Sequence, residues 1–426
     1  MSKEKNLDSF VEGPNIKKWV FNNSATCVTA DMPDSDLTCL DFWCKAGSSF
    51  EEKGEEGLAH FLEHMVFKGS EGLDAGEFDF QIEAIGGSSN AATGFDDVHY
   101  HVLVPSNSIE TALELLTNLV LKPSLCPDAY ATELEVVLEE IAQYQDQPDD
   151  QVFQKLLGTC WGDHPYGRSI LGFEESLRKS NPDLMRSFHD RLYKAENSCL
   201  AIAGAIPENI EDLLKRSYIP KFKSENENIS IKNIDKLNFN HKRIDIKIPR
   251  LESARILISW PIPPASEQLI IMGIEIAISI LSEGRRSRLV DHLREKLQIV
   301  ESIDMDITSL EEGGLVLLEA ICKEEDLEEV EKEIKIILKK TLNELPGYEE
   351  LERAKNIVRN GFCFGLEASY QVASFAGSCS LWGRNKEVMA PLKHIEYWTI
   401  NTIKEVIFPL LQNRFSSTLI IKPEKE

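Results

Sequence analysis

The sequence predicts an α+β fold of two similar units, each a mostly antiparallel sheet with helices packed on it. The chain has 426 residues, which is more than one ordinary hydrophobic core holds. A polar stretch divides it near the middle, and both sides repeat the same order of strand and helix patterns. We therefore predict an N-terminal domain at 1–221, a linker at 222–241 and a C-terminal domain at 242–426.

In the first half, apolar segments at 38–47 (TCLDFWCKAG) and 197–206 (NSCLAIAGAI) are predicted to form strands. Between them, SIETALELLTNLVLK at 108–122 has apolar residues at the 3.6-residue period of a helix. The first domain is therefore expected to alternate between sheet and helix.

The second half repeats this order. ARILISWPI at 254–262 and SSTLIIK at 416–422 are predicted strands, and LEEVEKEIKIILKKTLNEL at 327–345 is a predicted helix. The stretch at 222–241 is rich in Asn and Lys and has few large apolar residues, as is typical of a linker. The repeated order indicates an internal duplication.

The net charge of −25 excludes two classes of partner. A surface this acidic repels nucleic-acid phosphates and anionic membranes, so we expect neither as a partner. Hydrophobic residues make up 42% and charged residues 27%, which is the balance of a globular protein.

The first residues, MSKEKNLDSFVEG, are polar and resemble no secretion signal, and no long apolar run predicts a membrane helix. Nine cysteines without a Cys-x-x-Cys pair are typical of reduced thiols. The expected location is the cytoplasm.

One motif points to metal chemistry. His60, Glu63 and His64 lie in Leu58 to Phe67, a stretch without Pro or Gly that is predicted to be helical. Positions i and i+4 share a helix face, so the two imidazoles can bind one ion. Glu63 sits at the edge of that face, where it can reach a metal-bound water. A solvated face is the alternative, but the apolar neighbours argue against full exposure.

A catalytic zinc site usually has a third protein ligand. The stretch PDAYATELEVVLEEIAQYQDQPDD is a predicted helix between Pro127 and Pro148. Glu133 and Glu140 lie seven residues apart on roughly one face. Spacing alone does not choose between these two and the neighbouring Glu135 and Glu139, and a solvated acidic face would give the same pattern.

The motif is the inverted His-x-x-Glu-His of the inverzincins, and GLAHFLEHMVFKGS resembles the motif helix of the pitrilysin/insulinase metallopeptidases. The chain is most similar to bacterial members that look like the β subunit of the mitochondrial processing peptidase. The resemblance implies one Zn²⁺ per chain, held by His60, His64 and Glu140, with Glu63 as the catalytic base. It also implies that Glu133 is an auxiliary acidic catalytic residue.

The same resemblance implies a place for the substrate. IGGSSNAATG, at 85–94, is similar to the strand with which this family binds extended peptides. Asn90 and Ala91 would then contact the substrate. Without the resemblance, Gly86 and Gly87 would be interpreted as a plain turn.

The second half departs from the family pattern at one position. Catalytic partners supply an Arg and, seven residues later, a Tyr that grip the substrate. Here Arg294 is present but is followed by Glu301, and a carboxylate cannot donate to an oxyanion. Either the chain is the metal-bearing subunit of a split site, or Glu301 is an ordinary surface residue.

The resemblance therefore implies a zinc-dependent endopeptidase that cleaves peptides or unfolded segments in an enclosed chamber. Two units form half of a clamshell, so a dimer with another subunit of this family, hetero or homo, is expected, and the partner of a split site would carry the Arg and Tyr. The alternative is a non-catalytic structural or peptide-binding subunit of the same fold.

Overall fold

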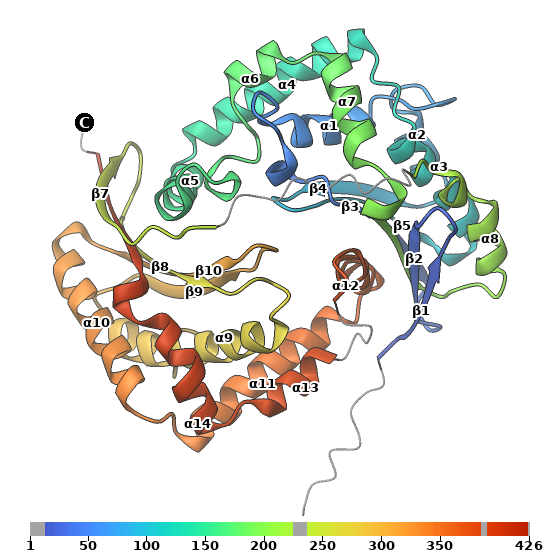
Figure 1. Ribbon diagram of the computed structural model, residues 1–426. Helices are drawn as coiled ribbons and strands as arrows, with labels where there is room; N and C mark the ends of the chain where they lie inside the picture. Colours follow the sequence, from blue (N-terminus) through green and yellow to red (C-terminus); the bar gives the residue numbers. More distant parts are fainter. Residues whose placement is uncertain (1–12, 225–236, 385–389, 425–426) are drawn as a thin grey trace, which may run out of the picture.

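The computed structural model describes residues 13–224, 237–384 and 390–424. Two sheets face each other across the middle of the molecule, and helices cover the outer side of each sheet (Figure 1). The first sheet belongs to the first half of the chain and the second sheet to the second half.

The first sheet has six strands in the order β1-β2-β6-β3-β5-β4. All neighbouring pairs are antiparallel except β2 and β6. In chain order the strands are β1 (Asn15–Val20), β2 (Thr26–Asp31), β3 (Leu37–Cys44), β4 (Ser88–Thr93), β5 (Val98–Pro105) and β6 (Ser198–Gly204). β4 is an edge strand, which leaves one side of its backbone without a neighbouring strand in the described part of the chain.

The second sheet has five strands in the order β7-β11-β8-β10-β9. Here only β7 and β11 run parallel. The strands are β7 (Arg243–Ile248), β8 (Ala254–Ile262), β9 (Ser302–Thr308), β10 (Gly314–Cys322) and β11 (Ser417–Pro423). Two mostly antiparallel sheets with one parallel pair each confirm the predicted fold class.

The outer helices bury an apolar stripe against their own sheet. Leu58, Phe61 and Met65 of α1, for example, are completely buried, as the amphipathic pattern predicts. The helices of the first half are α1 (Leu58–Val66), α2 (Glu77–Ala84), α3 (Ile109–Leu121), α4 (Pro127–Asp146), α5 (Pro148–Trp161), α6 (Glu174–Lys179), α7 (Pro182–Leu192) and α8 (Ile210–Arg216). Those of the second half are α9 (Gln268–Leu281), η6 (Val290–Lys296), α10 (Leu327–Asn343), α11 (Tyr348–Gly365), α12 (Ser369–Leu381), α13 (Ala390–Tyr397) and α14 (Ile400–Thr402).

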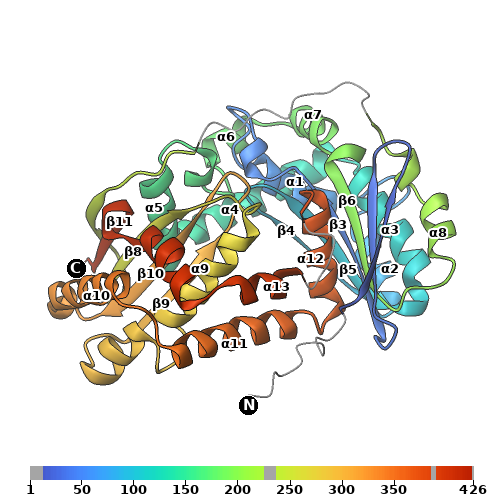
Figure 2. The same ribbon diagram turned by 60° about the horizontal axis from the view of Figure 1, so that its bottom comes forward.

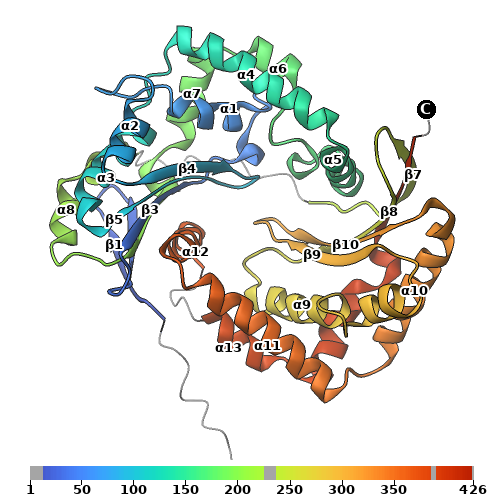
Figure 3. The ribbon, with the colours of Figure 1, turned by 180° about the vertical axis from the view of Figure 1, so that it is seen from behind.

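One helix of each half packs on the sheet of the other half. α12 of the second half packs on the inner face of the first sheet, against β2, β3 and β6 (Figure 2). Conversely, α5 of the first half packs on the inner face of the second sheet, against β7 and β11 (Figure 3). Each inner face is therefore covered by a helix from the other half, which joins the two units through apolar burial.

The predicted strands and helices lie where the patterns place them. The segments 38–47 and 254–262 correspond to β3 and β8, and the segments 108–122 and 327–345 to α3 and α10. The predicted domain limits remain a prediction, because most of the linker at 222–241 falls outside the described residues. Within the described chain, no helix is both long and apolar enough to cross a bilayer. All nine cysteines are unpaired.

Candidate metal centre

The helix α1 presents the motif residues from a buried position. Its start is held by Glu51, whose carboxylate accepts the backbone N–H groups of Gly57 and Ala59 at 3.0 and 2.9 Å. Gly57 has a φ of 95°, and a Cβ there would lie 2.5 Å from the carbonyl oxygen of Leu171. Only glycine therefore fits this close approach. The helix begins in a fixed position that orients His60 and the residues after it.

His60 and His64 meet Glu140 of α4, which is separated from His64 by 75 residues (65–139). Oε2 of Glu140 lies 3.8 Å from Nε2 of His60 and 3.5 Å from Nε2 of His64. The three ligand atoms all lie within 4.8 Å of one another. The tertiary structure thus selects Glu140 from the acidic residues that spacing left open.

Glu133 occupies a different position on the same helix. Its Oε1 lies 2.9 Å from Nδ1 of His64, and its Oε2 lies 2.8 Å from Nζ of Lys68. Burial raises the pKa of Glu133, but the hydrogen bonds of Lys68 and His64 outweigh it and leave the pKa below its ordinary value. A charged Glu133 holds the Nδ1 proton of His64, so the Nε2 lone pair points to Glu140.

The residues of this cluster fit a zinc ion. Two imidazole nitrogens and one carboxylate oxygen are a frequent ligand set of catalytic zinc. Burial, together with the charge of His64, lowers the pKa of His60 to about 4, so His60 is neutral, as a metal ligand must be. Its buried Nδ1 has no hydrogen-bond partner among the described residues.

Glu63 lines the same cavity as His60 and Glu140 but is not one of the three grouped ligand residues. Thr93, the last residue of β4, donates a hydrogen bond from its hydroxyl to Oε2 of Glu63. Burial raises the pKa of Glu63, and the hydrogen bond from Thr93 and the charge of His64 partly oppose this. Glu63 is therefore a partly buried carboxylate of raised basicity, held by a residue that sequence reasoning missed.

A cavity of about 360 Å³ opens next to these residues. His60, Glu63 and Glu140 form one wall. The other walls come from β4, α4, α5 and the loop before α6, through Ala92, Thr93, Tyr144, Phe153, Gln154 and Ile170. α5 carries no motif, so only its packing reveals Phe153 and Gln154 as cavity residues.

Asn90 and Ala91 lie on the edge strand β4, as the resemblance implies. The exposed Asn90 accepts the backbone N–H of Ala91 at 2.9 Å. The residues of β4 that line the cavity are, however, Ala92 and Thr93, one step further along.

Arg294 lies on η6, where its guanidinium pairs with the neighbouring Glu295 at 2.9 Å. Every described residue that lines the cavity comes from the first half, so Arg294 does not reach the cluster within this chain. Glu301 is exposed and accepts a hydrogen bond from Ser253 at 3.0 Å.

The structure thus brings together His60, Glu63 and His64 of one helix, a carboxylate from a second helix and a strand at the edge of the described sheet. These are the groups that a metallopeptidase type of site requires. Two family models match the chain, the insulinase model of peptidase family M16 over residues 26–174 and the peptidase M16 inactive domain over residues 179–358. The chain belongs to peptidase family M16, the insulinase and pitrilysin family of zinc proteases.

Relatives of similar length are named zinc proteases. An uncharacterized zinc protease of Rickettsia bellii is 29% identical over 391 residues, which are 90% of this chain and 92% of the relative. The uncharacterized zinc protease YmxG of Bacillus subtilis is 26% identical over 400 residues, with 92% and 96% covered.

Solved structures show the same fold. A protease from Helicobacter pylori superimposes with a TM-score of 0.88 at 22% identity, over 96% of this chain and all of the other. An M16-like peptidase from Alicyclobacillus acidocaldarius gives 0.85 at 18% identity, over 98% of this chain and all of the other. The two units thus have the two-unit α+β fold of these structures.

Proposed function

We propose that this chain is a zinc-dependent endopeptidase that hydrolyses peptides or unfolded segments. The observation that carries the proposal is the convergence of His60, His64 and Glu140 beside Glu63, in a cavity that borders a free strand edge. A purely structural zinc site would use four protein ligands and would need no neighbouring base. The arrangement instead leaves room for a water and a substrate.

His60, His64 and Glu140 would hold one Zn²⁺. When bound, the ion would lower the pKa of a water and polarise a substrate carbonyl. Glu63 accepts the proton of the attacking water and passes it to the nitrogen of the leaving amine. Thr93 keeps the carboxylate of Glu63 directed toward the cavity through its hydrogen bond. Glu133 positions the imidazole of His64 and is a positioning residue in this scheme.

The substrate would add to the free edge of β4. An extended peptide can form backbone hydrogen bonds with an unpaired edge strand, whatever its side chains are. Asn90 and Ala91 would contact the peptide through their backbone, and Ala92 and Thr93 would lead it toward Glu63. A folded protein cannot present an extended segment in this way, so the substrates are peptides or unfolded segments.

The second half of the active site would come from another subunit. Arg294 lies outside the cavity, and Glu301 stands where the family pattern has a Tyr donor. A partner of the same family that carries an Arg and a Tyr would supply the missing donors to the developing oxyanion. The chain therefore works as the metal-bearing half of a dimer in our proposal.

The test is peptide cleavage by the purified chain with and without chelator, and with and without a candidate subunit that carries the Arg and Tyr. Glu63→Gln should keep its zinc and lose cleavage, because the amide cannot accept the water proton. Glu139→Gln, an exposed change on α4, is the matched control and should behave like the wild type. Normal cleavage by Glu63→Gln would refute the assigned base. Full activity of the monomer alone would refute the split site.

A non-catalytic subunit is the competing function. It would bind peptides with the same affinity in the presence and absence of chelator and would show no cleavage with any partner.

A further inference from the structure

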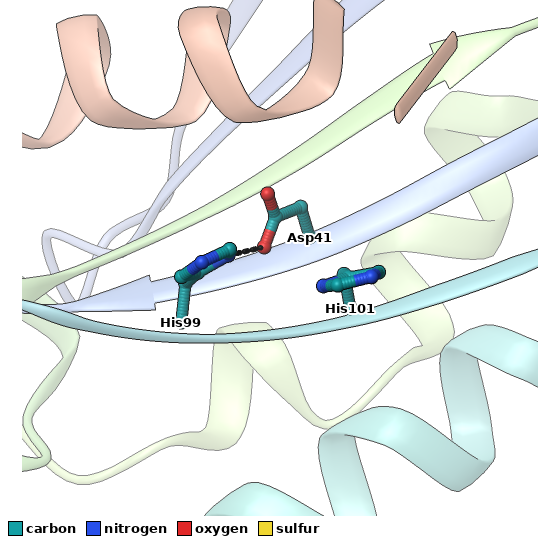
Figure 4. Close-up of side chains that lie close together, drawn as sticks. All are labelled: Asp41, His99 and His101. Carbon is teal, nitrogen blue, oxygen red and sulfur yellow. Dashed lines mark hydrogen bonds and ion pairs between the residues drawn. The ribbon is translucent and has the colours of Figure 1, made fainter. Parts of the chain in front are cut away.

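A second group of metal-ligating side chains lies on the inner face of the first sheet. Asp41 is on β3, and His99 and His101 are on β5. In the antiparallel register of these strands, Asp41 stands opposite His101, and Trp43 stands opposite His99. Opposite residues point to the same side of a sheet. Figure 4 shows the three side chains gathered on that side.

The three residues are as close together as the ligands of the first cluster. One ligand atom from each lies within 4.8 Å of the other two, the same limit that His60, His64 and Glu140 meet. Nδ1 of His99 lies 3.0 Å from Oδ1 of Asp41. Ligands of a tetrahedral zinc ion sit about 2.0–2.2 Å from the metal, so small side-chain rotations would bring all three onto one ion.

Two atoms of this group are buried without a partner. Oδ2 of Asp41 and Nδ1 of His101 have no hydrogen-bond partner in the described part of the chain. Asp41 is 0% exposed. A buried carboxylate oxygen without a donor is costly, and a cation is one of the few groups that would satisfy it.

The surroundings are apolar and come from both halves of the chain. α12 covers this face with Val372, Ala373 and Ala376, next to Trp43. The ring of Trp43 stacks on His99 with centroids 4.2 Å apart. This packing fixes the orientation of the side chains that would bind an ion.

His99 and His101 are only half-buried, so the group is partly exposed at one side. The ring of Tyr370, an exposed residue of α12, lies 4.6 Å from that of His101. Tyr370 also lines a cavity of about 650 Å³ between α9, α11 and α12. The side of Tyr370 is therefore the side from which an ion would reach the group in our proposal.

We propose that Asp41, His99 and His101 form a second site for a divalent transition-metal ion of the zinc type. Two imidazoles and one carboxylate suit zinc, and cobalt can replace it. The fourth position would be taken by water from the side of Tyr370. The ion would stabilise the inner face of the first sheet beneath α12, and thereby the contact between the two halves. The proposal does not depend on the peptidase function.

The experiment measures how much zinc the protein binds when ligands of the first cluster are replaced, alone or together with a ligand of the second cluster. Chelator-treated protein is incubated with ZnCl₂, desalted and analysed by mass spectrometry of the metal. His60→Ala combined with His64→Ala should retain one equivalent, and adding Asp41→Asn or His101→Gln should abolish it. His394→Gln, which changes a half-buried histidine of α13 outside both clusters, is the matched control.

A variant that misfolds would also lose its metal, so two further measurements report on metal bound to the folded protein. In the His60→Ala, His64→Ala protein, ZnCl₂ should raise the melting temperature, because an ion that binds only the folded state stabilises it. CoCl₂ should give visible absorption bands that His101→Gln removes. The proposal is overturned if the double variant binds no metal, or if Asp41→Asn keeps the full content. A plain ion pair between His99 and Asp41, without a metal site, gives the first of these results.

Discussion

Glu133 and His64 are joined by a hydrogen bond of 2.9 Å between Oε1 and Nδ1, on the side of the imidazole that faces away from Glu140. This contact fixes the tautomer of His64, so Nε2 stays free for a metal. Lys68 holds the other oxygen of Glu133. In our proposal Glu133 therefore acts through His64 rather than on the substrate.

Replacing Glu133 should weaken metal binding. We expect Glu133→Gln to lower zinc affinity about 10- to 100-fold, the usual cost of losing a carboxylate behind a ligating histidine. Competition with a zinc-binding dye measures this. Cleavage at saturating zinc should recover in large part. Glu139→Gln on the same helix is the control, and an unchanged affinity of Glu133→Gln would exclude the positioning role.

Replacing Thr93 should lower kcat without changing the zinc content. Thr93→Val keeps the shape of the side chain but removes the hydrogen bond to Glu63. A hydrogen bond to a charged group contributes about 1.5–3 kcal/mol, so kcat should fall about tenfold or more with unchanged zinc content. Thr93→Ser retains the hydroxyl and should restore most of the rate. If Val and Ser behave alike, the hydroxyl has no role.

Gly377 determines how closely α12 approaches the first sheet. A Cβ at this position would lie 2.5 Å from Cδ1 and 2.6 Å from Nε1 of Trp43. Overpacking of this kind costs about 1–3 kcal/mol, which exceeds the gain in helix propensity of up to about 1 kcal/mol. Gly377→Ala should therefore lower the melting temperature.

Gly361 on α11 is the matched control for Gly377. A Cβ there meets nothing within 4 Å, so Gly361→Ala should be neutral or stabilising by up to about 1 kcal/mol. Equal melting temperatures for the two variants would show that α12 does not pack against Trp43 as described.

Glu51 should make stability depend on pH. Burial raises the pKa of Glu51 to about 8, although the N–H groups of Ala59 and Gly57 oppose it. A carboxyl whose pKa is higher in the folded protein binds more protons when folded, between its ordinary pKa of 4.5 and about 8. The contribution of Glu51 to the free energy of unfolding is therefore complete below this pH range. It is lost as the pH rises through the range, by up to about 1.4 kcal/mol per pH unit.

Glu51→Gln removes this titration and keeps an oxygen that can accept the backbone N–H groups. Relative to the wild type, the variant should gain stability between pH 5 and pH 8, as measured by urea unfolding at several pH values. A constant difference between wild type and Glu51→Gln across this range would contradict the raised pKa.

The sequence predicted the local elements of this protein because they depend on local patterns. Apolar alternation and 3.6-residue periodicity placed β3, β8, α3 and α10, and the duplicated order placed two sheets. The spacing of His60 and His64 predicted that both imidazoles share one helix face, which α1 confirms.

Contacts between distant segments were decided by the tertiary structure alone. Spacing left Glu133, Glu135, Glu139 and Glu140 as alternatives. The packing of α4 on α1 places Glu133 at Nδ1 of His64 and Glu140 at Nε2 of the same ring. Thr93 reaches Glu63 only because β4 lies beside α1. No local pattern predicts that α5 and α12 each pack on the sheet of the other half. None predicts that Asp41 contacts His99 either. Strand register and helix packing depend on which residues the whole chain buries.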